Sequence, residues 1–216
     1  MRKIFLDVGG HFGQTLEEVT KPIYDFDIIY CFEPFPPHVN VLLEKFKNYN
    51  VKILEYGLSN TTSILDFYSD GLDDMGASVK KREGEKKIVT KCRFKRASDF
   101  FRDQIDESDM VIMKLNCEGS ECDILNDLID SNEISKIDNV MIDFDVRKYP
   151  HLVHEEPKLM KRMADIGFTN FSLCDQVMKG RTHQKRIAHW LRSLPWHDQF
   201  RPRANWIEHL RGMLRY

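Results

Sequence analysis

Short runs of hydrophobic residues recur along the chain, and most are separated by segments with a different pattern. The runs have the length of buried strands, and we expect strands at 4–8, 28–32, 51–56, 63–68, 88–94, 110–115, 137–144 and 168–173. Apolar residues at helical spacing predict helices at 14–21, 37–48, 97–104, 157–166, 183–194 and 203–214, and one that begins at Glu121. This alternation predicts an α/β fold with a mainly parallel central sheet, helices on both faces and a helical C-terminal tail.

Two local features add to that pattern. The extended segments 63–68 and 88–94 follow the third strand without an intervening helix, so we expect an extra hairpin there, with a polar surface loop between its strands. At the start of the helix near Glu121, Ser120 and Asp123 have the spacing of a capping box.

The turns after the first two strands carry the clearest chemical signal. The first strand ends at Asp7 and is followed by Gly9, Gly10 and Gly13, and the second ends at Glu33. Glycine allows the backbone to approach a ligand closely, and a carboxylate at the end of the next strand can bind both ribose hydroxyls. A strand, a glycine turn, a helix, a strand and an acidic residue therefore predict a nucleoside pocket.

The spacing of these glycines narrows the class of ligand that the turn can bind. The dinucleotide fingerprint is G-x-G-x-x-G, whereas this turn reads D-x-G-G-x-x-G, and its aspartate would repel a phosphate. A cationic or zwitterionic nucleoside such as S-adenosylmethionine fits better, and a nicotinamide dehydrogenase is the class of enzyme to exclude.

Length and charge indicate one domain over residues 1–216, with a core at 1–175 and a basic tail at 176–216. From Lys179 onward there are nine Lys or Arg and two acidic residues, so the tail carries about +7 and the rest of the chain about −9. Trp190, Trp196 and Trp206 suggest that the tail packs on the sheet or on a second subunit. Basic residues between aromatic ones also suit RNA, which keeps a nucleotide or RNA methyltransferase as an alternative.

The compartment in which we expect the protein is inferred from its hydrophobic segments, its first residues and its cysteines. No stretch has the roughly 20 apolar residues of a membrane span, and the first strand begins too early to leave room for a signal peptide. Five scattered cysteines fit apolar core positions in a reducing compartment. We therefore expect a cytoplasmic protein with no membrane partner.

Four motifs together resemble the FkbM-type family of S-adenosylmethionine-dependent methyltransferases. They are FLDVGGHFGQT, FEPFPP, YGLSN and MKLNCEGSECDIL, in that order. A weaker likeness continues through the strand at Asp143 and the segment GFTNFSL. The resemblance implies a Rossmann-like class I methyltransferase fold and methyl transfer, usually to a hydroxyl of a sugar, glycan or small natural product.

The resemblance and the turn chemistry together give the expected cofactor contacts, which are Asp7, Gly9, Gly10, His11, Gly13, Glu33, Ser59, Asn116 and Glu118. Ser59 fits a turn residue equally well. The chain departs from the family at Asn116, where an aspartate is usual, and at His11, where an asparagine is usual. These departures keep open the alternative of a cofactor-binding protein without catalysis.

Methyl transfer to a hydroxyl benefits from a base, and we name Asp145, His151 and Lys114 as catalytic candidates. Lys114 shares a strand face with Asn116 and is expected to be half-buried and paired with a carboxylate such as Glu118. Asp145 also fits a residue that braces its loop. The histidines after residue 150 match no standard metal-ligand spacing, so no metal is expected.

Overall fold

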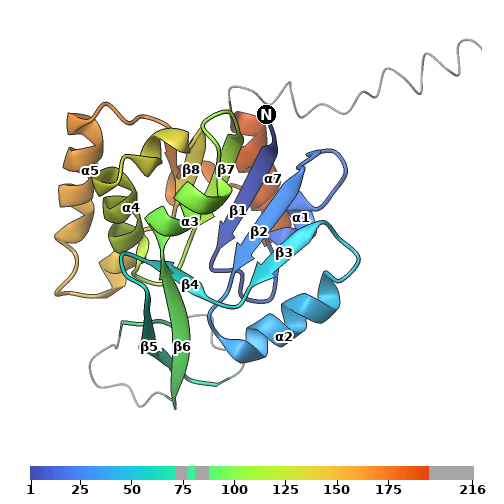
Figure 1. Ribbon diagram of the computed structural model, residues 1–216, viewed down its shortest axis with the longest axis horizontal. Coiled ribbons are helices and arrows are strands. Elements are labelled where there is room, and N and C mark those ends of the chain that lie inside the picture. Colours follow the sequence, from blue (N-terminus) through green and yellow to red (C-terminus); the bar gives the residue numbers. More distant parts are fainter. Residues whose placement is uncertain (72–76, 81–87, 195–216) are drawn as a thin grey trace, which may run out of the picture.

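The central sheet runs through the middle of the molecule, with helices on both sides of it (Figure 1). The computed structural model describes residues 1–71, 77–80 and 88–194. Six strands form the sheet in the order β3-β2-β1-β7-β8-β9, and every pairing is parallel. The strands are β1 (Lys3–Val8), β2 (Ile28–Phe32), β3 (Val51–Leu54), β7 (Met110–Leu115), β8 (Asn139–Ile142) and β9 (Phe171–Leu173). The predicted α/β class and parallel sheet are confirmed.

The order of the strands creates a switch point beside β1. The chain first adds β2 and β3 on one side of β1, and then returns to add β7, β8 and β9 on the other side. Connections therefore leave the carboxyl ends of β1 and β7 in opposite directions. Open α/β sheets bind ligands at such a point, because the diverging loops leave a crevice there.

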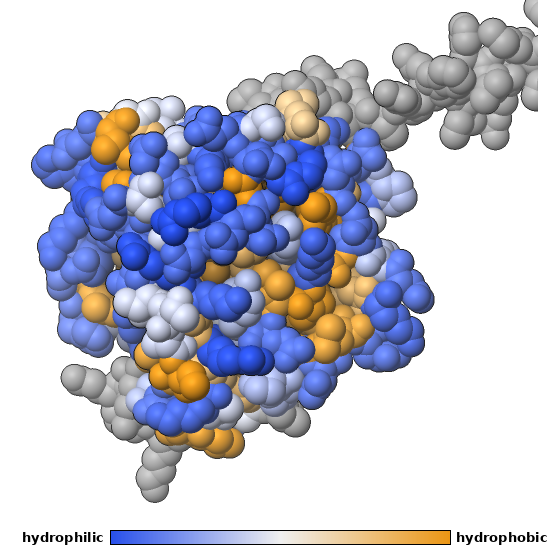
Figure 2. Space-filling view, viewed as in Figure 1, coloured by the Kyte–Doolittle hydropathy of each residue, from blue (hydrophilic) through white to orange (hydrophobic). Residues whose placement is uncertain are grey.

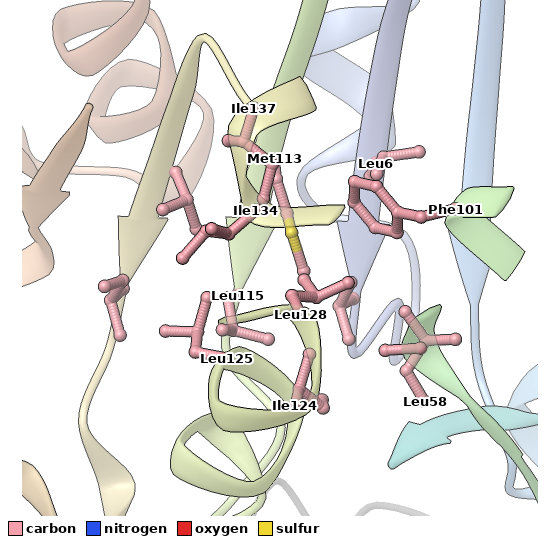
Figure 3. Packing of buried hydrophobic residues seen from close by; sticks show 14 of the residues in the cluster. Leu6, Leu58, Phe101, Met113, Leu115, Ile124, Leu125, Leu128, Ile134 and Ile137 are labelled. Atoms are coloured by element: carbon pink, nitrogen blue, oxygen red, sulfur yellow. The ribbon is translucent and has the colours of Figure 1, made fainter. Parts of the chain in front are cut away.

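Alternating residues of the strands contribute to two hydrophobic cores, one on each face of the sheet. One core lies between the sheet and the helices α3 (Ala97–Gln104), α4 (Glu121–Asp130) and α5 (Glu155–Asp165). Figure 3 shows Met113 of β7 between Leu128 of α4 and the nearby Ile134, and Leu6 of β1 beside Phe101 of α3. Ile134 belongs to the short helix η1 (Glu133–Lys136).

The other core joins the opposite face of the sheet to α1 (Leu16–Val19), α2 (Pro36–Lys45) and α7 (His183–Ser193). Phe5 contributes to this core while its neighbours Ile4 and Leu6 contribute to the first, as the two-residue period of a strand requires. Trp190 of α7 is fully buried here, and its indole N–H donates to Asn139 Oδ1 at 3.1 Å. A short helix α6 (Cys174–Val177) connects β9 to α7.

The predicted hairpin is present and belongs to a second, small sheet. β5 (Ser63–Ser69) and β6 (Ile88–Arg96) pair antiparallel, and β4 (Gly57–Ser59) adds to β6 in parallel. One side of this sheet packs Phe67, Cys92 and Phe94 against Phe35. Its other side and its ends expose hydrophobic residues, and Figure 2 shows such a patch at the lower edge of an otherwise largely hydrophilic face.

Several element boundaries differ from the prediction. The first helix is only four residues long, β3 ends before Glu55, and the last two sheet strands are shorter than their hydrophobic runs. The capping box is wrong: Ser120 is the N-cap of α4 but makes no side-chain cap hydrogen bond. The helix expected at 203–214 and most of the polar loop before β6 lie outside the described residues. No described helix is long and apolar enough to cross a membrane.

Candidate functional site

A cavity of about 190 Å³ opens at the carboxyl ends of β1, β2 and β7, beside the switch point. Its walls come from the turn after β1, the end of β2, the loop after β7, the hairpin sheet and the start of α7. The lining residues are Val8, Gly9, Gly10, His11, Gln14, Thr15, Phe32, Glu33, Pro34, His38, Gly57, Leu58, Phe67, Ala77, Val79, Phe94, Lys114, Asn116, Cys117, Glu118, Ser120 and His183.

The glycine turn is packed too tightly for any side chain. A Cβ at Gly9 would lie 1.9 Å from the carbonyl oxygen of Asn116, and φ at Gly9 is +86°. A Cβ at Gly10 would lie 2.2 Å from Cys31 Sγ. The N–H groups of Gly9 and Gly10 both donate to the carbonyl of Phe32 at 3.1 Å. The turn therefore fastens the ends of β1, β2 and β7 together and forms the floor of the cavity.

Glu33 lies at the end of β2 and is almost fully buried. Its Oε2 accepts from the N–H of His11 at 2.7 Å, and its Oε1 accepts from the N–H of Phe35 at 2.9 Å. The ring of His38 approaches the same carboxylate, with Nδ1 3.6 Å from Oε1. A carboxylate oxygen can accept more than one hydrogen bond, so Glu33 is held in place with acceptor capacity toward the cavity.

His11 places an imidazole in the cavity wall next to Glu33. Its φ is +47°, and its ring packs edge-on against Phe12 and His38 at centroid distances of 4.2 and 4.4 Å. Nε2 is buried and has no hydrogen-bond partner among the described residues. Burial lowers the pKa of His11, and the neighbouring His38 lowers it further. A neutral ring with an unsatisfied nitrogen is suited to a hydrogen bond with a ligand hydroxyl or amine.

Lys114 pairs with Asp7, not with Glu118 as the sequence suggested. The two residues are register partners on β1 and β7, and Nζ lies 3.1 Å from Asp7 Oδ1. Nζ also donates to the carbonyl of Gly9 at 2.7 Å. Burial raises the pKa of Asp7, although Lys114 opposes this effect. Asp7 is fully buried behind the turn and is not among the lining residues, so it acts on the cavity through Lys114.

Asn116 lines the cavity at the end of β7. Its side-chain N–H donates to Asp143 Oδ2 at 3.2 Å. An aspartate at this position would place two carboxylates side by side, whereas the amide forms a hydrogen bond. Asn116 is therefore held by Asp143, which directly follows the neighbouring strand β8.

The loop after β7 is strained and held from both sides. Glu118 has φ of +55° and Gly119 has φ of +104°. The N–H groups of Cys117 and Gly119 donate to Oε1 of the buried Glu121, at 3.1 and 3.0 Å. The carbonyl of Glu118 accepts from the hydroxyls of Ser78 and Tyr149 at 2.5 and 3.2 Å. Glu121 thus binds the loop that precedes its helix, in place of the predicted cap from Ser120.

Glu118 and Asp145 share one cation. Lys148, on the short helix η2 (Asp145–Lys148), donates to Glu118 Oε2 at 2.8 Å and lies 2.9 Å from Asp145 Oδ1. Burial raises the pKa of Glu118 to about 7; Lys148 opposes this effect and Asp145 reinforces it. Burial also raises the pKa of Glu121 to about 7. Two carboxyl groups near the cavity thus have pKa values close to neutral pH.

The remaining predicted residues lie around the cavity instead of in its lining. Asp145 is buried behind Glu118, and His151 is exposed on the loop after η2. Ser59 is buried at the end of β4, next to lining residue Leu58. Gly13 has φ of +79°, and a Cβ there would meet the ring of Phe46 at 2.4 Å, so its role in the structure is packing.

Sequence reasoning missed the contribution of α7. His183 lines the cavity, and its Nε2 lies 2.9 Å from the hydroxyl of Thr15. Burial lowers the pKa of His183 to about 4, and the charge of Lys114 lowers it further. It also missed the apolar wall from the hairpin sheet, which includes Phe67 and Phe94. Neither contribution has a local sequence signal, because each depends on how distant segments meet.

Among the residues that the structure describes, no group of three or more His, Cys, Asp or Glu side chains could hold a metal ion. The five cysteines are free, and Cys31, Cys92 and Cys122 are buried.

Comparison with known proteins gives little beyond this geometry. No protein family matches the chain, and no curated protein is similar to it. Among solved structures, it is similar to the crystal structure of methyltransferase FkbM from Methylobacillus flagellatus KT, with a TM-score of 0.39 and 17% sequence identity. The match covers 60% of this chain and 29% of that one, so this chain spans about a third of the length of its structural neighbour.

Proposed function

We propose that the protein is an S-adenosylmethionine-dependent methyltransferase that acts on a hydroxyl of a sugar, a glycan or a small natural product. The observation that carries the proposal is the cavity at the switch point, where the glycine turn after β1 and Glu33 at the end of β2 form adjoining walls. This is the arrangement that binds a nucleoside in open α/β sheets. The four motifs shared with FkbM-type methyltransferases lie around the same cavity.

The residues present fit an adenosyl group with an attached amino acid. Glu33 is fixed by two backbone N–H groups and retains lone pairs for ribose hydroxyls. The apolar side chains of Leu58, Phe67 and Phe94 line the cavity and suit a flat purine. The buried Nε2 of His11, which has no partner among the described residues, is a site for a polar group of the ligand. Asn116 and the Gly9–Gly10 turn, which also line the cavity, would contact the amino-acid part of the ligand.

When bound, the sulfonium supplies an electrophilic methyl group. The residues of this chain contribute by holding both reactants in line and by keeping water out. Alignment of two bound reactants is worth roughly 7–11 kcal/mol, more than the 10²–10⁴-fold of a typical general base. Loss of the nucleoside site should therefore abolish activity, whereas loss of a base should only reduce it.

Calorimetry with S-adenosylhomocysteine and with NAD tests the proposal. We expect micromolar or tighter binding of S-adenosylhomocysteine without added metal, and much weaker binding of NAD. Glu33→Gln should weaken the binding of S-adenosylhomocysteine by about 1.5–3 kcal/mol, the scale of a hydrogen bond to a charged group. Glu44→Gln is the matched control, because Glu44 is exposed on α2 and pairs only with Lys47 among the described residues. Preference for NAD, or equal binding by both variants, would overturn the proposal.

A methyl donor labelled on the methyl group then identifies the acceptor. Sugars, glycans and hydroxylated natural products form one panel, and RNA at low and high salt forms another. Label transfer to RNA alone would replace the proposed acceptor class with nucleic acid, and binding without any turnover would favour the non-catalytic alternative.

A further inference from the structure

Glu118 is a lining residue whose backbone is held in an unfavourable conformation, with φ of +55°. A non-glycine residue with positive φ is costly and persists only where the surroundings enforce it. Here Glu121 accepts from the N–H groups on both sides of Glu118, while Ser78 and Tyr149 donate to its carbonyl. These contacts come from three separate parts of the chain. Together they fix where the Glu118 side chain leaves the loop at the cavity wall.

The side chain of Glu118 lies close to two other carboxyl groups. Glu118 and Asp145 share the ammonium of Lys148, and the buried Glu121 lies on the other side of the same loop. Glu121 Oε2 and Asp145 Oδ2 have no hydrogen-bond partner among the described residues. Lys80 pairs with Asp123 of α4 at 3.0 Å. Because neighbouring carboxylates disfavour each other's charged form, a proton is readily held at this corner of the cavity.

We infer that Glu118 is the group that accepts the proton of the acceptor hydroxyl, and that Glu121 and Lys148 position it. This inference rests on the proposed methyl transfer. The O–H bond of the acceptor breaks and its proton goes to a carboxylate oxygen of Glu118. The electron pair left on the acceptor oxygen forms the new bond to the methyl carbon, as the carbon–sulfur bond breaks with its pair on sulfur.

The other candidates serve this role less well. Asp145 and His151 do not line the cavity. Lys114 is held as an ammonium by Asp7: burial alone would lower its pKa, but the aspartate outweighs this and raises it. His183 lines the cavity, but its pKa of about 4 makes it a weak base. Glu118 combines access to the cavity with a pKa of about 7, near the value at which a general base works best at neutral pH.

The pH at which Glu118 loses its proton depends on the described groups that lie around its side chain. On η2 and its end these are Lys148, Asp145 and the hydroxyl of Tyr149, and on α4 it is Glu121. Glu118 and Asp145 interact, so the measured midpoint belongs to the pair. We expect turnover to rise with pH through about 7 as the pair loses its proton.

Three variants test the inference. Glu118→Gln removes the proton acceptor but keeps the shape, Glu118→Asp keeps a carboxylate on a shorter stem, and Glu155→Gln is a control on α5 outside the cavity. We expect Glu118→Gln to lose roughly 10²–10⁴-fold in turnover, to lose the rise with pH, and to bind S-adenosylhomocysteine as the wild type does. Glu118→Asp should recover part of the turnover and the pH-dependent rise. Glu155→Gln should behave as the wild type in all three measurements.

A second readout needs no turnover. In ¹³C-glutamate-labelled protein without ligand, two carboxyl signals should titrate near pH 7, those of Glu118 and Glu121, and one of the two should disappear in Glu118→Gln. Wild-type turnover in Glu118→Gln, or no carboxyl titrating near 7 that this variant removes, would overturn the inference and leave the proposed function standing. A loss of S-adenosylhomocysteine affinity as large as the loss of turnover would make Glu118 a binding residue instead. Failure of the wild type to bind S-adenosylhomocysteine would remove the proposed function itself.

Discussion

The ammonium of Lys114 lies 3.1 Å from the carboxylate of Asp7, and the two side chains are 5% and 0% exposed. They join the central strands β1 and β7 at register-matched positions, with Lys114 in the lining of the cavity and Asp7 behind it. Removing one partner of a buried pair leaves an uncompensated charge, which typically costs about 3–5 kcal/mol. We expect Lys114→Met or Asp7→Asn to lower the free energy of unfolding by this amount in urea titrations. The double variant should regain much of the loss, and if it is as unstable as the sum of the singles, the pair is not coupled.

Gly9 provides a test of the turn. Gly9→Ala would bring a Cβ to 1.9 Å from the Asn116 carbonyl, in addition to the strain of φ at +86°. Gly167→Ala is the matched control, because φ there is +70° and no atom lies within 4 Å.

We expect Gly167→Ala to cost only about 1–2 kcal/mol of backbone strain. Gly9→Ala should force the ends of β1 and β7 apart, with a larger drop in melting temperature and loss of S-adenosylhomocysteine binding. Equal behaviour of the two variants would show that strain alone, and not the close approach to Asn116, requires glycine at position 9.

The buried Glu121 makes stability depend on pH in a defined direction. Its pKa rises from 4.5 to about 7 on folding, so the folded protein holds this proton at pH values where the unfolded chain has released it. The contribution is therefore fully present below about pH 4.5 and lost as pH rises toward 7.

Glu121→Gln removes this proton linkage. Relative to the wild type, the variant should gain stability between pH 4.5 and 7, by up to about 3 kcal/mol at the upper end. Comparison of the two proteins at each pH cancels the contributions of groups that do not interact with Glu121, such as His183. A stability difference that does not change with pH would show that Glu121 is ionised in the folded protein.

Trp190 carries the packing of α7. It is fully buried, and truncation of a large aromatic side chain typically costs about 3–5 kcal/mol. We expect Trp190→Ala to lose this amount and Trp190→Phe, which lacks only the hydrogen bond to Asn139 and part of the ring, to lose less. Removal of all residues after Lys179 should cause aggregation or a much lower melting temperature at any salt concentration. A stable truncated protein that has lost salt-sensitive RNA binding would favour the nucleic-acid role of the tail.

The sheet could be predicted because buried parallel strands are nearly continuous hydrophobic runs, which the chain shows at 4–8, 28–32 and 110–115. The glycine turn and Glu33 could be placed at one edge of the sheet for the same reason. Boundaries were less predictable. The run after residue 137 continues beyond β8, because Phe144 and Val146 are buried in the loop that follows the strand.

The ion pairs of the site were not predictable from neighbours in the sequence. For Lys114 the sequence predicts pairing with a carboxylate such as Glu118, four positions away, but its partner Asp7 comes from a strand that only the sheet order places beside it. Likewise, Ser120 and Asp123 matched a capping box, but the loop N–H groups are bound by the intervening Glu121. Local patterns fail here because burial lets a distant or unexpected carboxylate compete for the same donor.

Helix α7 closes the second hydrophobic core and also supplies His183 to the wall of the cavity. During synthesis, residues 183–193 leave the ribosome after all six strands of the main sheet. Until they emerge, the nascent chain lacks the cover for Phe5 and Ile112 as well as one side of the pocket. The same late segment of the chain therefore both covers this face of the sheet and completes the described wall of the cavity.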